Sequence, residues 1–539
     1  MTLLQRRFFL FFFALLFVTT APIIVLFAKG YRFDSHGKIF IYSGSVTVKS
    51  WPRDVDIYIN NKKQEKKKVN VINSSYTING IRPGKYVVRC EKDGYTSWIK
   101  NIEIHSGIST EMWNILLFPV ENMEIKRFSP GNITQFFLSP RDKDEVVFFS
   151  KDGDKNIVSV FDAGENKHEQ IYQTDSLDFL SPEEKENIEW SSDNKQILIP
   201  FQKDGQKVFI IARIKKEDLR DIIDLNSIFA EEIERREKQK APGAPLTPMR
   251  SQPEQKEINK LESGNIENSS GPDDNSAKQF KKVRWMFDKN DELVILNNDH
   301  ELYYINIEKP EEMILIDDQV SGFDFAGNRI YYTQLPNNIV WEIKSNDVRT
   351  KHQITNTVIT SEEDDFVELM AYDQYRIAII TQERDLYVYN HEKEKAEISM
   401  DKIISGARDI QFSDDGKKLL YWTTNEIWCL MLREWKVQPI REKGDRLFIT
   451  RLSKPIKNVQ WMDNYENLLF SVGNTVKSAS LDTRSHAYIV DVMELKNDIG
   501  EREMFYNKTS QRLFMITKQN ENSSLQSALL IDKTGFLGL

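Results

Sequence analysis

Cysteine is scarce in this chain of 539 residues, which has two, Cys90 and Cys429. Two cysteines cannot form a disulfide framework, and they cannot hold a zinc ion by themselves. Each lies in an apolar, strand-like stretch, so we expect two buried thiols in different domains. The seven histidines are scattered, and four of them are typical of isolated loop or surface positions: His168, His300, His352 and His486.

The short motifs that mark common catalytic sites are absent as well. The chain has no Gly-x-Ser-x-Gly nucleophile elbow, no Gly-x-x-x-x-Gly-Lys-Ser/Thr phosphate loop and no His-Glu-x-x-His zinc motif. Where His391 and Glu392 begin such a zinc motif, Lys395 replaces the second histidine. We therefore predict a protein that is not an enzyme, with no catalytic residues, no cofactor and no metal.

An excess of positive charge is also missing, because the formal net charge is -9. A general nucleic-acid binder would carry a basic excess, so no nucleic-acid partner is expected. The charge is unevenly spread. Twelve Lys or Arg and six Asp or Glu lie between Val46 and Ile104, so the rest of the chain carries about -15. A basic module beside an acidic one indicates domains with different surroundings.

Long apolar runs are absent apart from one, which extends from Phe8 to Ala28 without a charged side chain. This run is long enough to cross the roughly 30 Å hydrocarbon core of a bilayer as a helix. Arg6 and Arg7 precede it and Lys29 follows it, so the positive-inside rule favours a cytoplasmic N-terminus. We predict a cytoplasmic tip and transmembrane anchor over residues 1–30, with the bulk of the chain outside the cell membrane.

A cleaved signal peptide is the alternative interpretation of this run. Such a peptide has a shorter apolar region and small residues before its cleavage site. Here Pro22 directly follows Ala21, and the bulky Leu26 lies two residues before Ala28. Both features disfavour cleavage, so an uncleaved anchor is the prediction.

Short alternating runs follow from Gly44 to about Leu117. Ser45–Lys49 alternates polar and apolar residues, as a half-buried strand does. Further strand-like runs at 56–59, 86–90 and 95–105 are separated by the turn signals Asn60-Asn61, Arg82-Pro83-Gly84-Lys85 and Asp93-Gly94. Regular turns between short strands predict a small antiparallel β-sandwich over residues 31–118.

This segment resembles a PEGA domain, a family of small β-domains in bacterial and archaeal envelope proteins. The resemblance is carried by Tyr58 to Asn60, by Gly80 to Tyr86 and by Asp93 to Tyr95. The tetrapeptide that names the family is not matched, since Pro52-Arg53-Asp54-Val55 stands there with the proline alone retained. The resemblance covers about 75 residues and implies an extracytoplasmic surface module without chemistry of its own.

A basic cluster lies between two of these predicted strands. It consists of five lysines: Lys62, Lys63, Lys66, Lys67 and Lys68. One hypothesis is contact with anionic lipid or an anionic wall polymer. The alternative is a solvated hairpin loop with ordinary solubilising charges.

One motif recurs after Phe118, an aromatic-bearing strand, a polar turn and a second apolar strand. The clear copies cover residues 135–150, 188–199, 283–296, 410–422, 459–471 and 503–517, and weaker ones cover 323–333 and 370–380. The spacing of roughly 40–50 residues, with about four strands per unit, is that of a β-propeller blade. We predict an all-β fold with a propeller over residues 119–539, of eight blades or alternatively seven. The blades are similar to the irregular ones of TolB-like or WD40-like propellers.

Two local features of the repeat have functional alternatives. Trp190, Trp285 and Trp461 share one repeat position, which is typical of a blade core rather than of a sugar-stacking platform. The turns Asp414-Asp415-Gly416 and Asp152-Gly153-Asp154 contain too few ligands for a closed calcium loop, so hairpin turn chemistry is the expected role.

The repeat is interrupted between residues 225 and 280, where we predict a disordered insertion. A short helix is plausible over Asn226 to Lys240, and Ala241-Pro242-Gly243 ends it. The polar stretch from Ser251 to Lys278 cannot bury enough apolar surface to order itself. A partner-docking arm is the alternative interpretation. At the other end, the apolar runs Ser527–Ile531 and Gly535–Leu539 predict a last strand that closes the propeller.

These observations predict a membrane-anchored, extracytoplasmic binding or scaffold protein that presents its propeller to a protein or glycan. A propeller enzyme acting on an envelope polysaccharide or lactone is the alternative, because carboxylates or histidines from distant blades can meet at a central channel. A purely structural role without a specific ligand is the third possibility.

Overall fold

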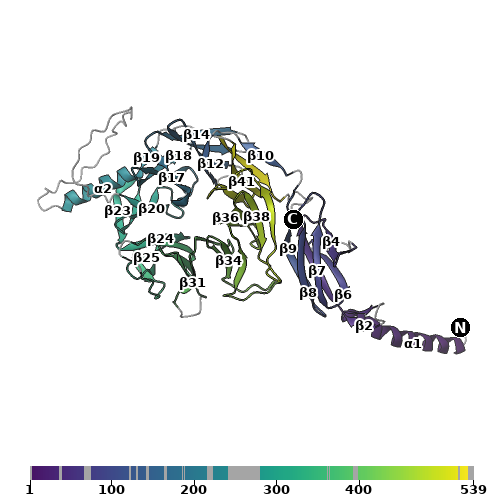
Figure 1. Cartoon of the computed structure of the whole chain (residues 1–539). Helices are drawn as coiled ribbons and strands as arrows, with labels where there is room; N and C mark the ends of the chain where they lie inside the picture. Colours follow the sequence, from purple (N-terminus) through teal and green to yellow (C-terminus); the bar gives the residue numbers. More distant parts are fainter. Residues whose placement is uncertain are drawn as a thin grey trace. The chain divides into compact units, whose positions relative to one another are not determined.

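The computed structural model in Figure 1 gives the structure of most of the chain. It describes residues 3–34, 39–65, 74–120, 123–128, 132–140, 145–162, 167–184, 186, 188–214, 222–240, 279–360, 362, 365–392, 398–519 and 522–531. The chain divides into two compact units. One contains residues 1–150, 161–167 and 406–539, and the other contains residues 151–160 and 168–405.

Helix α1 (Leu3–Ala28) contains the predicted membrane segment. Its window Gln5–Ala28 has a mean hydropathy of 2.6, and no residue of the window is buried in the protein. The hydroxyls of Thr19 and Thr20 donate to helix carbonyls one turn earlier, at 2.9 Å from Leu15 and 2.7 Å from Leu16. Polar side chains in hydrocarbon need such internal partners, so the helix is compatible with a membrane interior.

A β-hairpin that the sequence patterns did not predict follows α1. Its strands β1 (Tyr31–Asp34) and β2 (Ile39–Tyr42) pair antiparallel in a sheet of their own. Gly30, at φ +93°, ends the helix in the left-handed region that favours glycine. The hairpin is tied to the next domain through Ser43, whose carbonyl accepts from the Gly107 N–H at 3.0 Å.

Residues 44–116 form the predicted β-sandwich. One sheet has the order β6-β3-β9 and the other β5-β4-β7-β8. Their strands are β3 (Gly44–Trp51), β4 (Asp56–Ile59), β5 (Lys62–Lys63), β6 (Tyr76–Ile81), β7 (Gly84–Glu91), β8 (Trp98–Ile104) and β9 (Ser109–Leu116). The two sheets share one apolar core, which includes Val46, Val88 and Trp98. Asn60 and Asn61, both at positive φ, form the turn that the sequence indicated.

The expectation of a purely antiparallel sandwich is wrong in one place, because β3 pairs with β9 in parallel. The chain leaves β3 for β4 and β5 of the opposite sheet and returns to pair β6 with one edge of β3. It then forms β7 and β8 of the opposite sheet and pairs β9 with the other edge of β3. Such a crossover brings the first and last strands together in the same direction, which a hairpin cannot do. The predicted turn positions are compatible with both arrangements, so local patterns could not distinguish them.

After the sandwich, the described residues form eight successive antiparallel sheets with the strand order of propeller blades. The first three sheets contain β11 (Ile133–Leu138), β12 (Glu145–Asp152), β13 (Lys155–Asp162) and β14 (Lys167–Thr174); then β15 (Asp178–Phe179), β16 (Glu189–Trp190), β17 (Gln196–Lys203), β18 (Gln206–Arg213) and β19 (Ile222–Asp224); then β20 (Phe280–Trp285), β21 (Glu292–Asn297), β22 (Leu302–Asn306) and β23 (Lys309–Asp317).

The remaining blades follow the same pattern. They contain β24 (Val320–Ala326), β25 (Arg329–Gln334), β26 (Ile339–Lys344) and β27 (Asp347–Gln353); β28 (Glu368–Asp373), β29 (Arg376–Ile380), β30 (Asp385–Asn390) and β31 (Asp401–Ser405); β32 (Asp409–Phe412), β33 (Lys418–Trp422), β34 (Glu426–Met431) and β35 (Arg446–Arg451); β36 (Ile456–Trp461), β37 (Asn467–Val472), β38 (Thr475–Ser480) and β39 (Ile489–Glu494); and β40 (Met504–Asn507), β41 (Arg512–Gln519) and β42 (Asn522–Leu529).

The last sheet joins the two ends of the blade array. Strand β10 (Ile125–Phe128) comes directly after the sandwich and pairs with β42, in the order β10-β42-β41-β40. The predicted C-terminal closing strand is thus confirmed over its first part, while residues 535–539 lie outside the described residues. Eight blades, rather than seven, is the count over the described residues.

A repeated hydrogen bond links the first strands of neighbouring blades. In the first unit, Gln411 Oε1 accepts from the Trp461 N–H at 3.1 Å, and Gln460 Oε1 accepts from the Tyr506 N–H at 2.7 Å. In both strands the acceptor stands directly before an aromatic residue, and it satisfies a backbone N–H of the next blade.

The second unit repeats this arrangement with carboxylates instead of amides. There Glu189 Oε2 accepts from the Trp285 N–H at 2.9 Å, and Asp324 Oδ2 accepts from the Ala371 N–H at 2.9 Å. The aromatic position is the blade-core position that the sequence predicted. Trp285 and Trp461 are buried, and Trp190 is half-buried.

The predicted insertion begins with an ordered helix, as its first residues suggested. Helix α2 (Leu225–Lys240) packs Phe229 into the core of the blades formed by β15–β19 and β20–β23. Asp224 Oδ1 accepts from the Ser227 N–H at 3.1 Å, which caps the first turn. The disorder predicted for residues 225–280 is therefore wrong over residues 225–240, which form α2. Residues 241–278 lie outside the described residues.

Candidate functional site at the junction of sandwich and blades

The free edge of strand β9 is covered by side chains from the last blades. The Gln438 amide mimics a neighbouring strand, because Nε2 donates to the Ser109 carbonyl at 2.9 Å and Oε1 accepts from the Glu111 N–H at 3.0 Å. Arg484 donates to the Glu111 carbonyl at 2.7 Å, and Asn467 donates to the Asn114 carbonyl at 3.1 Å. These contacts cover an edge that would otherwise be a template for unwanted strand pairing, and they also fix the sandwich to the blades.

A buried ion pair lies beside this edge. The Lys100 side chain is 1% exposed, and its Nζ lies 3.2 Å from Asp482 Oδ1 and also donates to the Asp482 carbonyl. Burial lowers the pKa of Lys100, and the Asp482 charge opposes this effect. Burial acts to raise the pKa of Asp482, but the Arg484 hydrogen bonds and the Lys100 charge outweigh it, so this pKa lies below its ordinary value. The carboxylate therefore stays ionised and holds both cations.

A second buried network supports the loop that carries Gln438. Glu466 accepts from Lys418 Nζ at 2.5 Å and from Arg441 Nη1 at 3.1 Å, and all three side chains are at most 5% exposed. The Lys418 ammonium also lies 4.1 Å from the centre of the Trp435 ring. One carboxylate of the blade of β36–β39 thus neutralises two buried cations, which fixes residues 433–445 against that blade.

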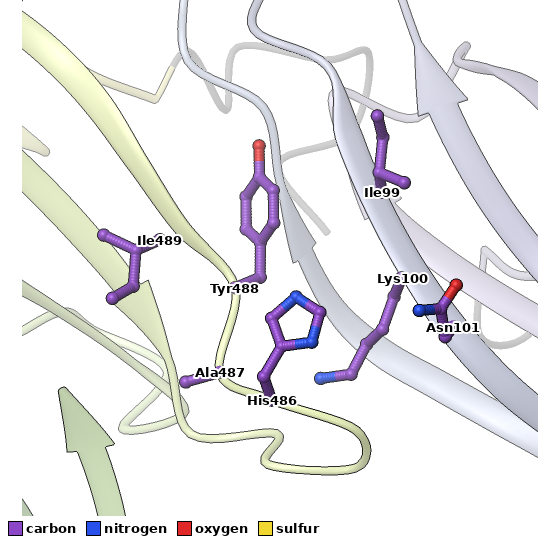
Figure 2. A pocket seen from close by; sticks show the side chains of 7 residues that line it. All are labelled: Ile99, Lys100, Asn101, His486, Ala487, Tyr488 and Ile489. Atoms are coloured by element: carbon purple, nitrogen blue, oxygen red, sulfur yellow. The ribbon is translucent and has the colours of Figure 1, made fainter.

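A cavity of about 410 Å³ lies at the junction (Figure 2). Ile99, Lys100 and Asn101 of strand β8 line one side, and residues 486–489 of the propeller line the other. Tyr488 closes one end, because its hydroxyl donates to the Ser97 carbonyl and its ring lies 5.9 Å from that of Trp98. Burial raises the pKa of Tyr488 to about 12, so the phenol stays protonated at neutral pH. The Tyr488 hydroxyl and the Lys100 ammonium thus join the two domains on either side of the cavity.

The alternative of a propeller enzyme requires carboxylates or histidines that converge and are available for chemistry. In the second unit, Glu189, Arg284 and Asp324 do converge from three successive first strands. Arg284 bonds both carboxylates, with Asp324 Oδ1 at 2.5 Å, while the second oxygen of each accepts a backbone N–H. Burial raises the pKa of Glu189, and the Arg284 charge opposes this. The cluster therefore joins three successive blades.

The structure places the predicted membrane-flanking residues at both ends of the apolar helix. Arg6 and Arg7 are exposed in its first turns, and Lys29 is exposed directly after its last turn. Of the basic cluster, Lys62 and Lys63 are exposed in β5, and Lys63 Nζ pairs with Asp56 at 2.6 Å. Lys66, Lys67 and Lys68 lie outside the described residues, so an anionic contact of the cluster stays a prediction.

The remaining sequence candidates have structural roles. Asp415 Oδ1 accepts from the Ser413 hydroxyl at 2.7 Å and the Lys417 N–H at 3.1 Å, which is the predicted turn chemistry. His300 lies in a loop as expected, but it is buried rather than exposed, because its ring stacks on Phe366 at 4.1 Å. Both cysteines are buried thiols, as predicted. Within the ranges described, no three His, Cys, Asp or Glu side chains are grouped as metal ligands would be.

The junction itself was not identified from the sequence, although one signal was present. Strand β8 alternates strictly between buried and exposed residues, and Lys100 occupies a buried position between Trp98 and Ile102. A lysine at a core position of an edge strand requires a polar partner from outside the sandwich. That signal predicts a docking contact but not its partner, which lies more than 380 residues away.

Comparisons with known proteins bear on the fold of the chain alone. No family model matches the chain, and no curated protein matches it. Similar solved structures include the Dos1 propeller, with 11% identity over 75% of this chain and 94% of that chain at a TM-score of 0.45. An oligogalacturonate lyase in complex with manganese has 8% identity over 76% of this chain and 94% of that chain, at a TM-score of 0.38. Such values carry no information on function.

Proposed function

We propose that this chain is a membrane-anchored, extracytoplasmic scaffold that presents a β-propeller to a protein or glycan through a firmly docked β-sandwich. The observation that carries the proposal is helix α1, whose apolar window Gln5–Ala28 has no buried residue. An apolar helix of this length would expose a large surface to water, whereas a bilayer removes it. The basic residues at its start, Arg6 and Arg7, favour a cytoplasmic N-terminus.

The way the sandwich is bound to the blades supports this role. Four backbone groups on the edge of β9 and the ammonium of Lys100 are bound by the blades of β32–β35 and β36–β39. A flexible linker would need none of these contacts. We further propose that the sandwich is a PEGA-type domain, supported by the turns at Asn60-Asn61 and Gly94, where the matched segments have left-handed backbone.

The scaffold role is favoured over the enzyme alternative by the state of the converging carboxylates. Each carboxylate oxygen of Glu189 and Asp324 has a partner, either Arg284 or a backbone N–H, so both carboxylates serve the contact between blades. A general acid or base needs a free hydrogen-bonding position toward its substrate. We therefore assign no catalytic residue to the propeller.

The anchor is tested by flotation of the full-length chain with lipid vesicles, followed by an alkaline carbonate wash. The expected result is that the full chain floats and resists the wash, while a matched variant that starts at residue 30 stays in solution. The intact mass of the chain isolated from membranes then distinguishes an anchor from a cleaved signal. Recovery of full-length protein in a detergent-free soluble fraction would contradict the proposal.

A further inference from the structure

The hairpin directly after α1 presents four aromatic rings on one face. Tyr31 pairs with Tyr42 and Phe33 with Phe40 across the two strands, with ring centres 5.0 Å and 5.4 Å apart. Paired residues and residues two apart lie on the same side of a hairpin, so the four rings form one face. Phe33 is 59% exposed, Phe40 47% and Tyr42 41%. We call this surface the aromatic face.

The aromatic face is held in a fixed place relative to the helix end. The Arg32 guanidinium folds back and donates to the Phe27 carbonyl at 2.7 Å, while it stacks over the Phe27 ring at 3.6 Å. The Tyr42 ring packs on Gly30, where an added Cβ would come within 3.2 Å of it. The hairpin is therefore a continuation of the anchor and not a free loop.

The length of the anchor indicates what covers this face. At about 1.5 Å per residue, the 24-residue window Gln5–Ala28 is roughly 36 Å long. It exceeds the roughly 30 Å hydrocarbon core, so an end of the helix reaches the headgroup layer. Tyr31 follows Ala28 by three residues. Tyrosine is enriched at this layer, where its ring contacts acyl chains and its hydroxyl contacts water.

We propose that the aromatic face inserts into the headgroup layer of the outer leaflet and is a second membrane contact beside the helix. This inference rests on the proposed membrane anchor. A single helix is free to rotate and tilt, whereas a second contact to one side of its end restricts both motions. The hairpin would thus set the orientation in which the sandwich leaves the membrane.

The test places a single environment-sensitive fluorophore on the aromatic face of the full-length chain. Phe33→Cys provides the labelling site, and Phe40→Cys on the paired strand provides an independent one. The native thiols Cys90 and Cys429 are fully buried, and burial raises the pKa of each to about 12, so they do not compete for the label. Glu103→Cys, at an exposed position of strand β8, is the matched control.

Labelled chains are floated with phosphatidylcholine vesicles that carry a spin-labelled lipid quencher near the headgroup. The expected result is loss of fluorescence at positions 33 and 40, with a blue-shifted emission, and no loss at position 103. A floated chain whose labels at 33 and 40 are both unquenched overturns the inference and leaves the anchor intact. That result would also follow if a second copy of the chain covered the rings. A chain that does not float overturns the anchor and the inference together.

Discussion

Substitution of Glu466 should loosen residues 433–445, the loop that carries Gln438 to the junction. Its carboxylate is the shared partner of Lys418 and Arg441, and the three side chains are 5%, 0% and 3% exposed. Glu466→Gln keeps the shape but leaves two buried cations without a counter-charge. Lysine can lose its proton under such conditions, whereas arginine cannot. The uncompensated guanidinium should therefore dominate the cost.

The expected magnitude follows from this geometry. Removing one partner of a buried ion pair costs about 3–5 kcal/mol. Lys418 keeps the Tyr465 carbonyl at 2.7 Å, and Arg441 keeps the Leu481 carbonyl at 2.9 Å. Because both cations retain an acceptor, we expect the lower end, about 3 kcal/mol, which is roughly a 100-fold change in an opening equilibrium.

Hydrogen exchange of the detergent-solubilised full chain, followed by mass spectrometry, is the appropriate assay. It reports local opening of residues 433–445 even if the whole chain does not unfold in one step. The variant should exchange roughly 100-fold faster there than wild type. Glu312→Gln is the control, because Glu312 pairs with Lys309 at the surface and such a pair contributes about 0–1 kcal/mol. Equal exchange in both variants would refute the reasoning.

Three further predictions follow from buried polar groups. The pKa of Asp482 in the folded protein lies below its value of about 3.8 in the unfolded chain, so its contribution to stability is present above pH 3.8 and is lost as the pH falls through the folded pKa. Asp482→Asn removes this contribution, so in acid-unfolding curves the junction of the variant should lose less stability below about pH 4 than that of wild type. Cys90 and Cys429 should resist thiol reagents at pH 8 in native protein and react fully in urea, and rapid native reaction would contradict their burial. Gln460→Leu leaves the Tyr506 N–H unpaired and should lower the free energy of chemical unfolding by about 1–3 kcal/mol. The control Gln170→Leu, at an exposed position, should lower it little, and equal losses in the two variants would contradict the role of Gln460 between blades.

The repeat could be predicted because its signals are local. In the copy at 410–422, the aromatic strand β32, the turn at Asp414-Asp415-Gly416 and the apolar strand β33 all lie within thirteen residues. Each blade buries its strands against neighbours, which leaves apolar runs between turn residues in the sequence. The same reasoning found helix α2 and the last strand β42, since both are amphipathic or apolar segments with clear limits.

The junction could not be predicted because its partners are distant in sequence. The Gln438 amide meets Ser109 across 329 residues, and Arg484 meets Glu111 across 373. Hydrophobic periodicity records which face of a strand is buried, but it does not record what covers a strand edge. The β1–β2 hairpin was missed for a different reason, because four residues per strand give too short a pattern to separate it from the anchor.

The chemistry of the junction also bears on the role of the sandwich. An apolar interface can shift in register with little change in energy, because the hydrophobic effect has no direction. The contacts at β9 and Lys100 instead pair individual carbonyls and carboxylates with individual donors, so a shifted arrangement would leave buried charges unpaired at a cost of several kcal/mol. One arrangement of sandwich and blades is thereby selected. If the aromatic face restricts the rotation and tilt of the anchor, the orientation set at the membrane reaches the last blades through these directional contacts, as a scaffold requires and a tether does not.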